Sequence, residues 1–213
     1  MDLDGTLISV SSEKELLLSL LGRRRLARGA FLRFLAAYAL HPGRTLALGK
    51  GWNRMYLRGM SPADLKRHCV ELAERLRSRV RPEVARLVSS WSNDGTHVVL
   101  LSATLLPLAR ELAPLCGASR CVASRPKTID GVLTGETDGV RPWGRAKADL
   151  ARELIEELSV DPREVSALGD SWSDRHILRL CGRPLAVSPA AKLRKLALGE
   201  GWSIMEGRHA RWA

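Results

Sequence analysis

The sequence of 213 residues has few cysteines, few aromatic residues and no long uncharged hydrophobic run. The four cysteines show neither Cys-x-x-Cys spacing nor a histidine cluster at zinc-ligand distance, which argues against a zinc-binding module. We interpret them as reduced thiols in the protein interior, as is typical of a cytoplasmic protein. Because the first sequence motif starts at residue 2, we expect no signal peptide.

The longest apolar stretch covers residues 26–40 and contains Arg28 and Arg33. It is too short and too charged to span a bilayer, so no transmembrane segment is expected. The pattern favours a helix that packs against its own protein. A helix that lies on a membrane surface is the less common alternative.

The formal net charge is +11, and the arginines that produce it are dispersed along the chain, with one tight run at residues 23–25. Basic chains often bind nucleic acid, phosphate-bearing metabolites or acidic membranes. No basic stripe with interleaved aromatic residues and no known nucleic-acid module is present, so no nucleic-acid partner is expected. Two explanations stay open, namely an arginine-rich proteome and electrostatic attraction of an anionic substrate.

The hydrophobic pattern divides the chain into two parts. Residues 12–79 have a helical pattern throughout, and Pro62 follows Ser61 as the first residue of a new helix. Another helix is expected from Pro82 to about Asn93. After these helices, short apolar strands alternate with helices, which predicts a parallel sheet covered on both faces. The expected strands are 97–101, 120–123, 165–168 and 185–187, the expected helices are 105–115, 145–158, 174–180 and 190–198, and residues 126–142 are expected to form a hairpin.

The predicted fold class is therefore α/β, a three-layer Rossmann-like parallel sheet with an inserted α-helical cap. Residues 1–11 and 80–213 form the predicted core, and residues 12–79 form the predicted cap. A central strand normally has about five residues, but only Met1 precedes Asp2. We expect either an unusually short first strand or a start that lies further upstream.

Polar residues cluster where the predicted strands end, which is where parallel α/β sheets bind ligands. Asp2 and Asp4 end the first strand, Ser102 to Thr104 end the second, and Lys147 lies in the first turn of a helix. The segment Gly169 to Asp174 follows another strand. Carboxylates hold Mg²⁺ through hard oxygen ligands, an ammonium neutralises phosphoryl oxygens, and a further carboxylate can attack phosphorus. This set predicts phosphoryl transfer.

These motifs resemble those of the haloacid dehalogenase superfamily, in the branch that includes phosphoserine phosphatase. The resemblance covers nearly the whole chain outside residues 12–79. It rests on D-L-D-G-T-L at 2–7, S-A-T at 102–104, Lys147 in G-R-A-K, G-D-S-W-S-D at 169–174, D-G-V-L-T-G at 130–135 and A-V-S-P-A-A-K-L-R-K-L-A at 186–197.

The resemblance implies Asp2 as the nucleophile and Asp4 as the general acid and base. It implies Mg²⁺ held by Asp2, by the backbone carbonyl of Asp4 and by Asp170. Ser102 with Ala103 would bind the phosphoryl group.

The resemblance also implies that Lys147 pairs with the phosphate and with Asp2. Asp174 would support the metal site and orient Lys147, as carboxylates behind a metal site do.

Several of these residues have structural alternatives. Ser102 would be a helix N-cap, Asp174 would favour a helix N-terminus, and Arg145 and Lys127 compete with Lys147. Glu13 is expected to be a surface or capping residue rather than a ligand for a substrate amine. The arginines 23–25 and Arg54 are expected on solvated helix faces rather than at a second anionic group of the substrate.

The predicted function is Mg²⁺-dependent hydrolysis of a small phosphorylated metabolite through an aspartyl-phosphate. A phosphotransferase or phosphomutase with the same nucleophile is one alternative, and a catalytically silent module that binds a phosphorylated ligand is another. The sequence identifies neither the substrate nor the oligomeric state.

Overall fold

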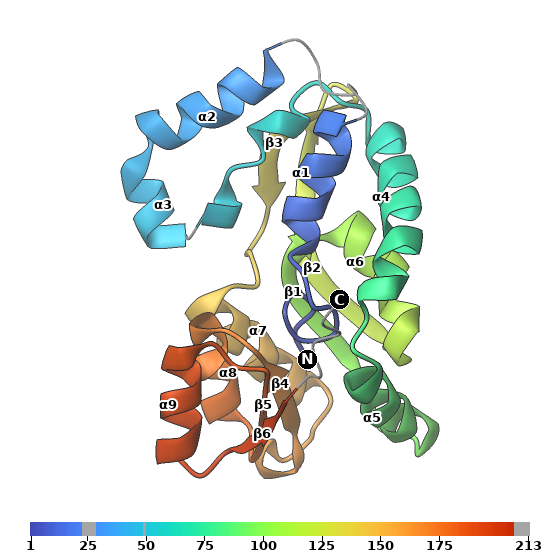
Figure 1. Cartoon of the computed structure of the whole chain (residues 1–213), viewed down its shortest axis with the longest axis vertical. Coiled ribbons are helices and arrows are strands. Elements are labelled where there is room, and N and C mark those ends of the chain that lie inside the picture. Colours follow the sequence, from blue (N-terminus) through green and yellow to red (C-terminus); the bar gives the residue numbers. More distant parts are fainter. Residues whose placement is uncertain (23–28, 49, 207–213) are drawn as a thin grey trace, which may run out of the picture.

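The computed structural model describes residues 1–22, 29–48 and 50–206, and it confirms the predicted α/β fold (Figure 1). Within these described residues, six strands form two sheets, ordered β1-β2-β3 and β4-β5-β6. The β1-β2, β4-β5 and β5-β6 pairs are parallel, whereas β2 and β3 form an antiparallel hairpin. The strands are β1 (Val99–Leu105), β2 (Arg120–Ile129), β3 (Val132–Asp138), β4 (Ser166–Gly169), β5 (Arg183–Val187) and β6 (Ser203–Met205).

The first three residues lie between the two sheets and connect them. The amide of Leu101 in β1 donates to the Met1 carbonyl at 2.9 Å, and the Asp2 amide donates to the Leu168 carbonyl of β4 at 3.0 Å. The amine of Met1 donates to the Val99 carbonyl at 2.7 Å. Residues 1–3 thus take the central place in the sheet, although they are not assigned as a strand.

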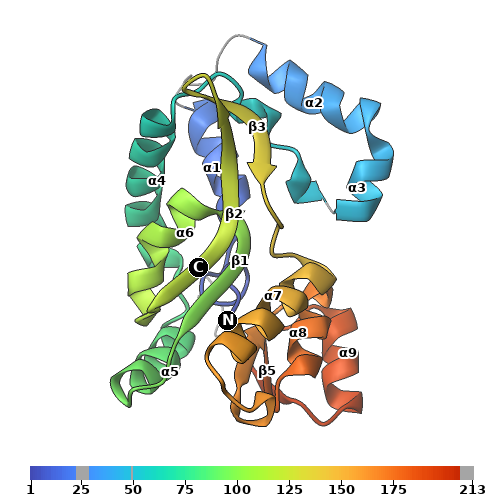
Figure 2. The same cartoon turned by 180° about the vertical axis from the view of Figure 1, so that it is seen from behind.

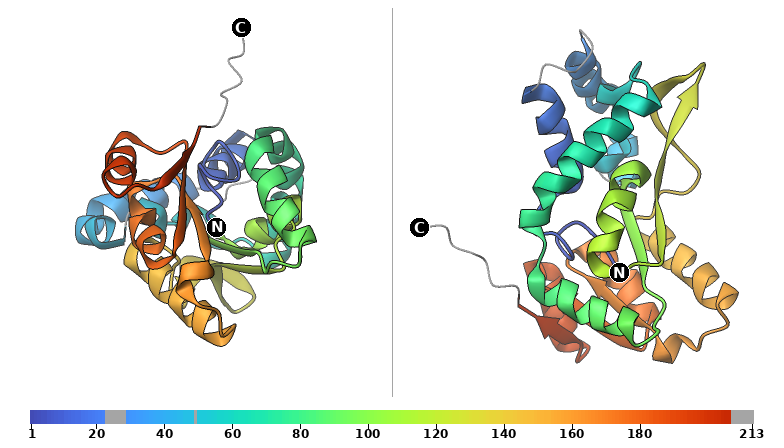
Figure 3. Two further views of the ribbon diagram at one scale, coloured as in Figure 1. Left: turned by 90° about the horizontal axis from the view of Figure 1, so that it is seen from below. Right: turned by 90° about the vertical axis from the view of Figure 1, so that its right-hand side faces the viewer.

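Helices cover both faces of the sheets, as Figure 3 shows from below. Leu100 and Leu168 face a core shared with α5 and α6, whereas the adjacent residues Leu101 and Ala167 face a core shared with α7, α8 and α9. This alternation is the period of two that a strand imposes on its side chains. The helices of this part are α5 (Pro82–Asn93), α6 (Leu106–Leu112), α7 (Gly144–Glu157), α8 (Arg175–Leu180) and α9 (Ala191–Gly199), with 3-10 turns η4 (Ala113–Cys116), η5 (Pro162–Glu164) and η6 (Trp172–Asp174).

Residues 12–79 are helical but more interrupted than predicted. Ser61 caps the longest of their helices, because its side chain accepts a hydrogen bond from the Asp64 amide. The β2-β3 hairpin rises beside this segment (Figure 2), and Gly59 donates to the Leu133 carbonyl at 2.8 Å. The elements are α1 (Ser12–Gly22), α2 (Ala30–Leu40), α3 (Pro42–Leu48), η1 (Lys50–Trp52), η2 (Met55–Leu57), α4 (Pro62–Leu76) and η3 (Arg77–Arg79). The boundaries of a cap at 11/12 and 79/80 stay a prediction.

The strands differ from their predicted bounds where the pattern was not purely apolar. β1 continues through Ser102 to Leu105, past the predicted end at residue 101, and its pairing with β2 shifts register between Ser102 and Leu105. The short strand β6 was not predicted. Among the described residues, no helix combines the length and apolar character that crossing a bilayer requires.

Candidate active site

A cleft of about 440 Å³ lies where the carboxyl ends of β1 and β4 meet the first residues of the chain. The structure brings all the predicted site residues to this cleft. Its lining includes Asp2, Asp4, Ser102, Ala103, Lys147, Asp170 and Asp174. The two competing cations lie elsewhere, since neither Arg145 nor Lys127 lines it.

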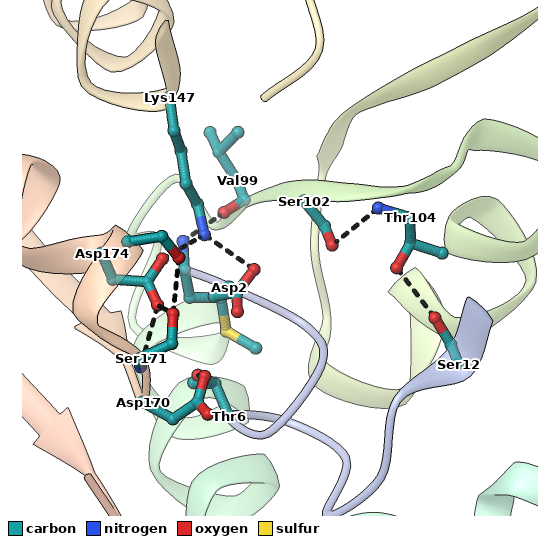
Figure 4. Close-up of polar contacts among 12 residues, drawn as sticks. Asp2, Thr6, Ser12, Val99, Ser102, Thr104, Lys147, Asp170, Ser171 and Asp174 are labelled. Carbon is teal, nitrogen blue, oxygen red and sulfur yellow. Dashed lines mark hydrogen bonds and ion pairs between the residues drawn. The ribbon is translucent and has the colours of Figure 1, made fainter. Parts of the chain in front are cut away.

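Lys147 is the cation at the centre of the site (Figure 4). It extends from the first turn of α7, and its side chain is only 3% exposed. Its Nζ lies 2.7 Å from Asp2 Oδ1 and 2.7 Å from Asp174 Oδ1. Burial by itself would lower the pKa of Lys147, but the Asp174 and Asp2 charges raise it above its usual value. Lys147 is therefore a fixed positive charge throughout the neutral pH range.

Asp174 both holds Lys147 and caps a turn. Its Oδ2 accepts hydrogen bonds from the Ser171 amide at 3.1 Å and from the Ser171 hydroxyl at 2.6 Å. Burial raises the pKa of Asp174, but Lys147 and Ser171 outweigh burial, so the net shift is downward. Asp174 can therefore stabilise the start of a helical turn and orient Lys147 at the same time.

Three carboxylates lie close enough to share one cation. One oxygen each from Asp2, Asp170 and Asp174 lie within 4.8 Å of one another. Burial raises the pKa of Asp170 to about 8, with the charges of Asp2 and Asp174 adding to the effect. Burial also raises the pKa of Asp2, against the opposing effect of Lys147. Such crowding of hard oxygen ligands fits a divalent cation such as Mg²⁺.

Gly5 and Thr6 shape the loop that carries Asp4. Gly5 has φ +78°, and a Cβ atom there would lie 2.1 Å from Asp170 Oδ2, so both the backbone and the space require glycine. The Thr6 hydroxyl donates to Asp170 Oδ1 at 3.3 Å. Arg81, which the sequence did not single out, is buried and donates from Nε to the Gly5 carbonyl at 3.1 Å.

Asp4 is poised between its protonated and ionised forms near neutral pH. Burial raises its pKa to about 7, the hydrogen bonds from Ser12 oppose this, and the Asp2 charge adds to it. Among the described residues, no hydrogen-bond partner reaches the buried Asp4 Oδ1. A carboxyl group with this pKa can both donate and accept a proton at physiological pH.

Ser102 is buried within β1 and does not cap a helix. Its Oγ accepts a hydrogen bond from the Thr104 amide at 3.2 Å, which leaves its own hydrogen available to a ligand. The Ala103 carbonyl accepts from Arg54 Nη2 at 2.8 Å and from Ser124 Oγ at 2.7 Å. These bonds fix the backbone beside the cleft.

Glu13 and Arg54 were expected on solvated surfaces, and the structure corrects both expectations. Arg54 is a fully buried side chain that forms an ion pair with Glu13, and Glu13 lines the cleft. Glu13 lies in α1 and Arg54 lies in the link between η1 and η2, 41 positions later, so no local pattern reveals the pair. The run of arginines 23–25 lies outside the described residues.

Arg141 and Gly51 also line the cleft, and they lie close to each other and to Glu13. A Cβ atom at Gly51 would lie 2.2 Å from Arg141 Nη2, so the guanidinium occupies space that only glycine leaves. Burial, and then the nearby charge of Arg54, lower the pKa of Arg141 to about 10. In the sequence, the one indication of a role for Arg141 was its position between the hairpin and the helix that carries Lys147.

The chain has clear relatives in sequence and in fold. A family model described as haloacid dehalogenase-like hydrolase matches residues 1–179. The "Inhibition of morphological differentiation protein" of Streptomyces azureus is 32% identical, over 96% of this chain and 76% of its own length. "Phosphoserine phosphatase SerB1" of Mycobacterium tuberculosis is 28% identical, over 100% of this chain and 71% of its own. A solved structure of a substrate-bound phosphoserine phosphatase shares the fold, with TM-score 0.67 and 15% identity over 97% of this chain and 90% of that one.

The class that these matches define is a hydrolase built on an α/β sheet. More narrowly, the chain belongs to the haloacid dehalogenase-like hydrolase family, because the family model matches most of its length. The resemblance inferred from the sequence motifs is thereby confirmed. The phosphatase names of the relatives agree with the predicted enzyme class.

Proposed function

We propose that this phosphatase-type hydrolase cleaves phosphate monoesters in a Mg²⁺-dependent reaction with Asp2 as the covalent nucleophile. The observation that carries the proposal is the arrangement of Asp2. Its carboxylate is held at 2.7 Å from the buried Lys147 ammonium, at the base of a cleft that also contains Asp4, a carboxyl group with a pKa of about 7.

In the first step, an Asp2 carboxylate oxygen attacks phosphorus while the bond between phosphorus and the ester oxygen breaks. Asp4 gives its proton to the leaving alkoxide, so the alcohol departs neutral. Lys147 and the Ser102 hydroxyl face the charge on the phosphoryl oxygens. The product of this step is an aspartyl-phosphate and an ionised Asp4.

In the second step, Asp4 takes a proton from water, and the resulting hydroxide attacks phosphorus. The bond between phosphorus and the Asp2 oxygen breaks, which restores the carboxylate and releases inorganic phosphate. Asp4 ends protonated, ready for the next substrate. A pKa near 7 suits a group that must act once as an acid and once as a base.

Mg²⁺ fits the donor set, since Asp2 and Asp170 offer closely spaced carboxylate oxygens. Gly5, the residue that follows Asp4, packs directly against the Asp170 carboxylate. When bound, the ion would neutralise charge on the phosphoryl group. We propose the same residues as its ligands, with Asp174 fixing Lys147 behind them.

The substrate is proposed to be a small phosphorylated metabolite. Glu13 and Arg141 also line the cleft, and we propose that they contact the part of the substrate beyond the phosphate. Phosphoserine is one candidate, through the named relatives. We also keep a cytoplasmic setting as a proposal, because Cys69, Cys116, Cys121 and Cys181 are all free.

The test is release of inorganic phosphate from an aryl phosphate with Mg²⁺ and with EDTA. We expect Asp2→Asn to abolish turnover while the melting temperature shows a folded protein, and Asp149→Asn, at an exposed carboxylate of α7, to retain it. Borohydride treatment of acid-quenched wild type should convert residue 2 to homoserine, the product of reducing an acyl phosphate. Activity of Asp2→Asn at the wild-type rate would contradict the assignment. Transfer of the phosphoryl group to an added alcohol instead of water would identify a phosphotransferase.

A further inference from the structure

Helix α2 is apolar on nearly all sides and yet mostly exposed. Ten of its eleven residues are apolar or aromatic, with Arg33 as the exception, but only Ala30 and Ala37 are buried. Leu32 is 71% exposed and Leu40 is 73% exposed, and Leu46 of the adjoining helix α3 is 88% exposed. A helix with this composition normally lies in a protein core or in a membrane. Exposed apolar patches of this kind mark surfaces that bind another apolar surface.

One side of α2 is anchored, which leaves the other side free. The Phe34 ring packs edge-on against Tyr38 and Tyr56, with ring centroids 5.2 and 5.5 Å apart. Tyr38 in turn contacts Trp52 of η1. The opposite face of α2, spaced three to four residues apart, consists of Leu32, Leu35, Ala36, Ala39 and Leu40, all exposed. We call these five residues and Leu46 the α2 face.

The charge of the chain is concentrated in the segment that carries the α2 face. Residues 16–63 contain nine Lys and Arg residues and no Asp or Glu, so they carry a formal charge of +9. One of the nine, Arg54, is buried and paired with Glu13, so at most eight can meet an anionic surface. The rest of the chain contains 25 basic and 23 acidic residues, which nearly cancel. The arginines are dispersed along the whole chain, whereas the acidic residues all lie outside residues 16–63. Arg33 flanks the α2 face, and Arg44 of α3 lies 5.4 Å from the Trp52 ring and 3.8 Å from Glu136.

From the apolar face and the one-sided charge together, we propose that the α2 face docks on the surface of an anionic lipid bilayer. The leucines would enter the interface while exposed basic residues of the segment, such as Arg33, Arg44 and Arg58, meet the lipid phosphates, as in other helices that lie in a membrane surface. A second copy of the chain is a poorer occupant, because a twofold contact would bring two segments of charge +9 together. No described helix crosses a bilayer, so the contact is peripheral.

Vesicle cosedimentation tests this directly. The chain should bind phosphatidylcholine vesicles that contain phosphatidylglycerol at least about tenfold more tightly than vesicles of phosphatidylcholine alone, since each basic residue near an anionic surface contributes roughly fivefold. High salt should remove most of this difference. The double variant Leu32→Glu/Leu40→Glu should bind the anionic vesicles at least about tenfold more weakly, because two leucines no longer enter the interface.

The matched control is Leu198→Glu on α9, which changes a leucine that is 68% exposed but lies outside the α2 face. Melting temperature and aryl phosphate turnover should be the same in wild type and both variants, because the changed residues lie on the surface and outside the cleft. Binding is measured without turnover, so its outcome is separate from that of the proposed phosphatase chemistry. The proposal is overturned if the wild type stays in the supernatant with anionic vesicles, or if the double variant binds as wild type does. It is equally overturned if light scattering shows a dimer that the double variant dissociates.

Discussion

Replacing Lys147 by methionine removes the buried ammonium that pairs with both Asp2 and Asp174. The Nζ atom makes two ion pairs of 2.7 Å in a side chain only 3% exposed. Breaking a buried ion pair by removing one partner lowers the free energy of unfolding by about 3–5 kcal/mol. For a chain of this size we expect the melting temperature to fall by roughly 6–20 °C at pH 8.

The stability lost in Lys147→Met should be larger at high pH than at low pH. Lys147 stays charged across the neutral range, because the pKa of Lys147 is raised. Without it, the pKa values of Asp2 and Asp174 rise, so the folded variant binds more protons than the folded wild type at pH 5 to 7. A folded state that binds more protons than the unfolded state loses stability as pH increases. The variant should therefore lose more stability, relative to wild type, at pH 8 than at pH 5.

Thermal and urea denaturation in EDTA at both pH values measures this effect. Arg145→Met, an exposed position on the same helix, controls for the change of charge and should shift the melting temperature very little. The reasoning is refuted if Lys147→Met destabilises by less than about 1 kcal/mol. It is refuted too if the loss is the same at pH 5 and pH 8.

Three further predictions follow from the same site. Gly5→Ala should destabilise the protein by at least about 1 kcal/mol and weaken Mg²⁺ binding in calorimetry, whereas Gly59→Ala, also at positive φ but in open space, should destabilise without affecting Mg²⁺. The rise in melting temperature caused by Mg²⁺ should be larger at pH 8 than at pH 6, because Asp170, with a pKa of about 8, must lose its proton to bind the ion; an equal rise at both pH values would contradict this. Glu13→Gln should lower the free energy of unfolding by about 3 kcal/mol in urea titrations, since it leaves the buried Arg54 guanidinium without its carboxylate; Glu15→Gln, at a position of α1 outside the cleft, should leave it unchanged.

The sequence predicted that the residues of the candidate site would lie together, because local rules place them at one edge of the sheet. Asp2, Ser102 and Asp170 each lie at or near the end of a short apolar strand, and parallel strands end at one edge of a sheet. Ser61 before Pro62 predicted a helix start for an equally local reason, a side chain that caps and a ring that fits the first turn.

What the sequence did not reveal depends on contacts between distant segments. The burial of Arg54 is matched by its ion pair with Glu13, which lies 41 positions earlier in the chain, on the far side of α2 and α3 in the sequence. For α2, periodicity identified an apolar helix but not whether the rest of the protein covers it. The structure packs one side of α2 against the rest of the protein, as expected, but it leaves Leu32 and Leu40 on the other side exposed.

The position of residues 1–3 between the two sheets has a consequence for the order of folding. The hydrogen bond from Asp2 to Leu168 closes a loop of more than 160 residues, whereas each three-stranded sheet can form from closer segments. Contacts of such long range form slowly, because loop closure opposes them. Ser102 belongs to one sheet, Asp170 follows the other, and Asp2 joins the two, so we expect the proposed catalytic residues to come together only once residues 1–3 have docked between the sheets. Protection of the Asp2 amide from hydrogen exchange during refolding would then report when the proposed active site is complete.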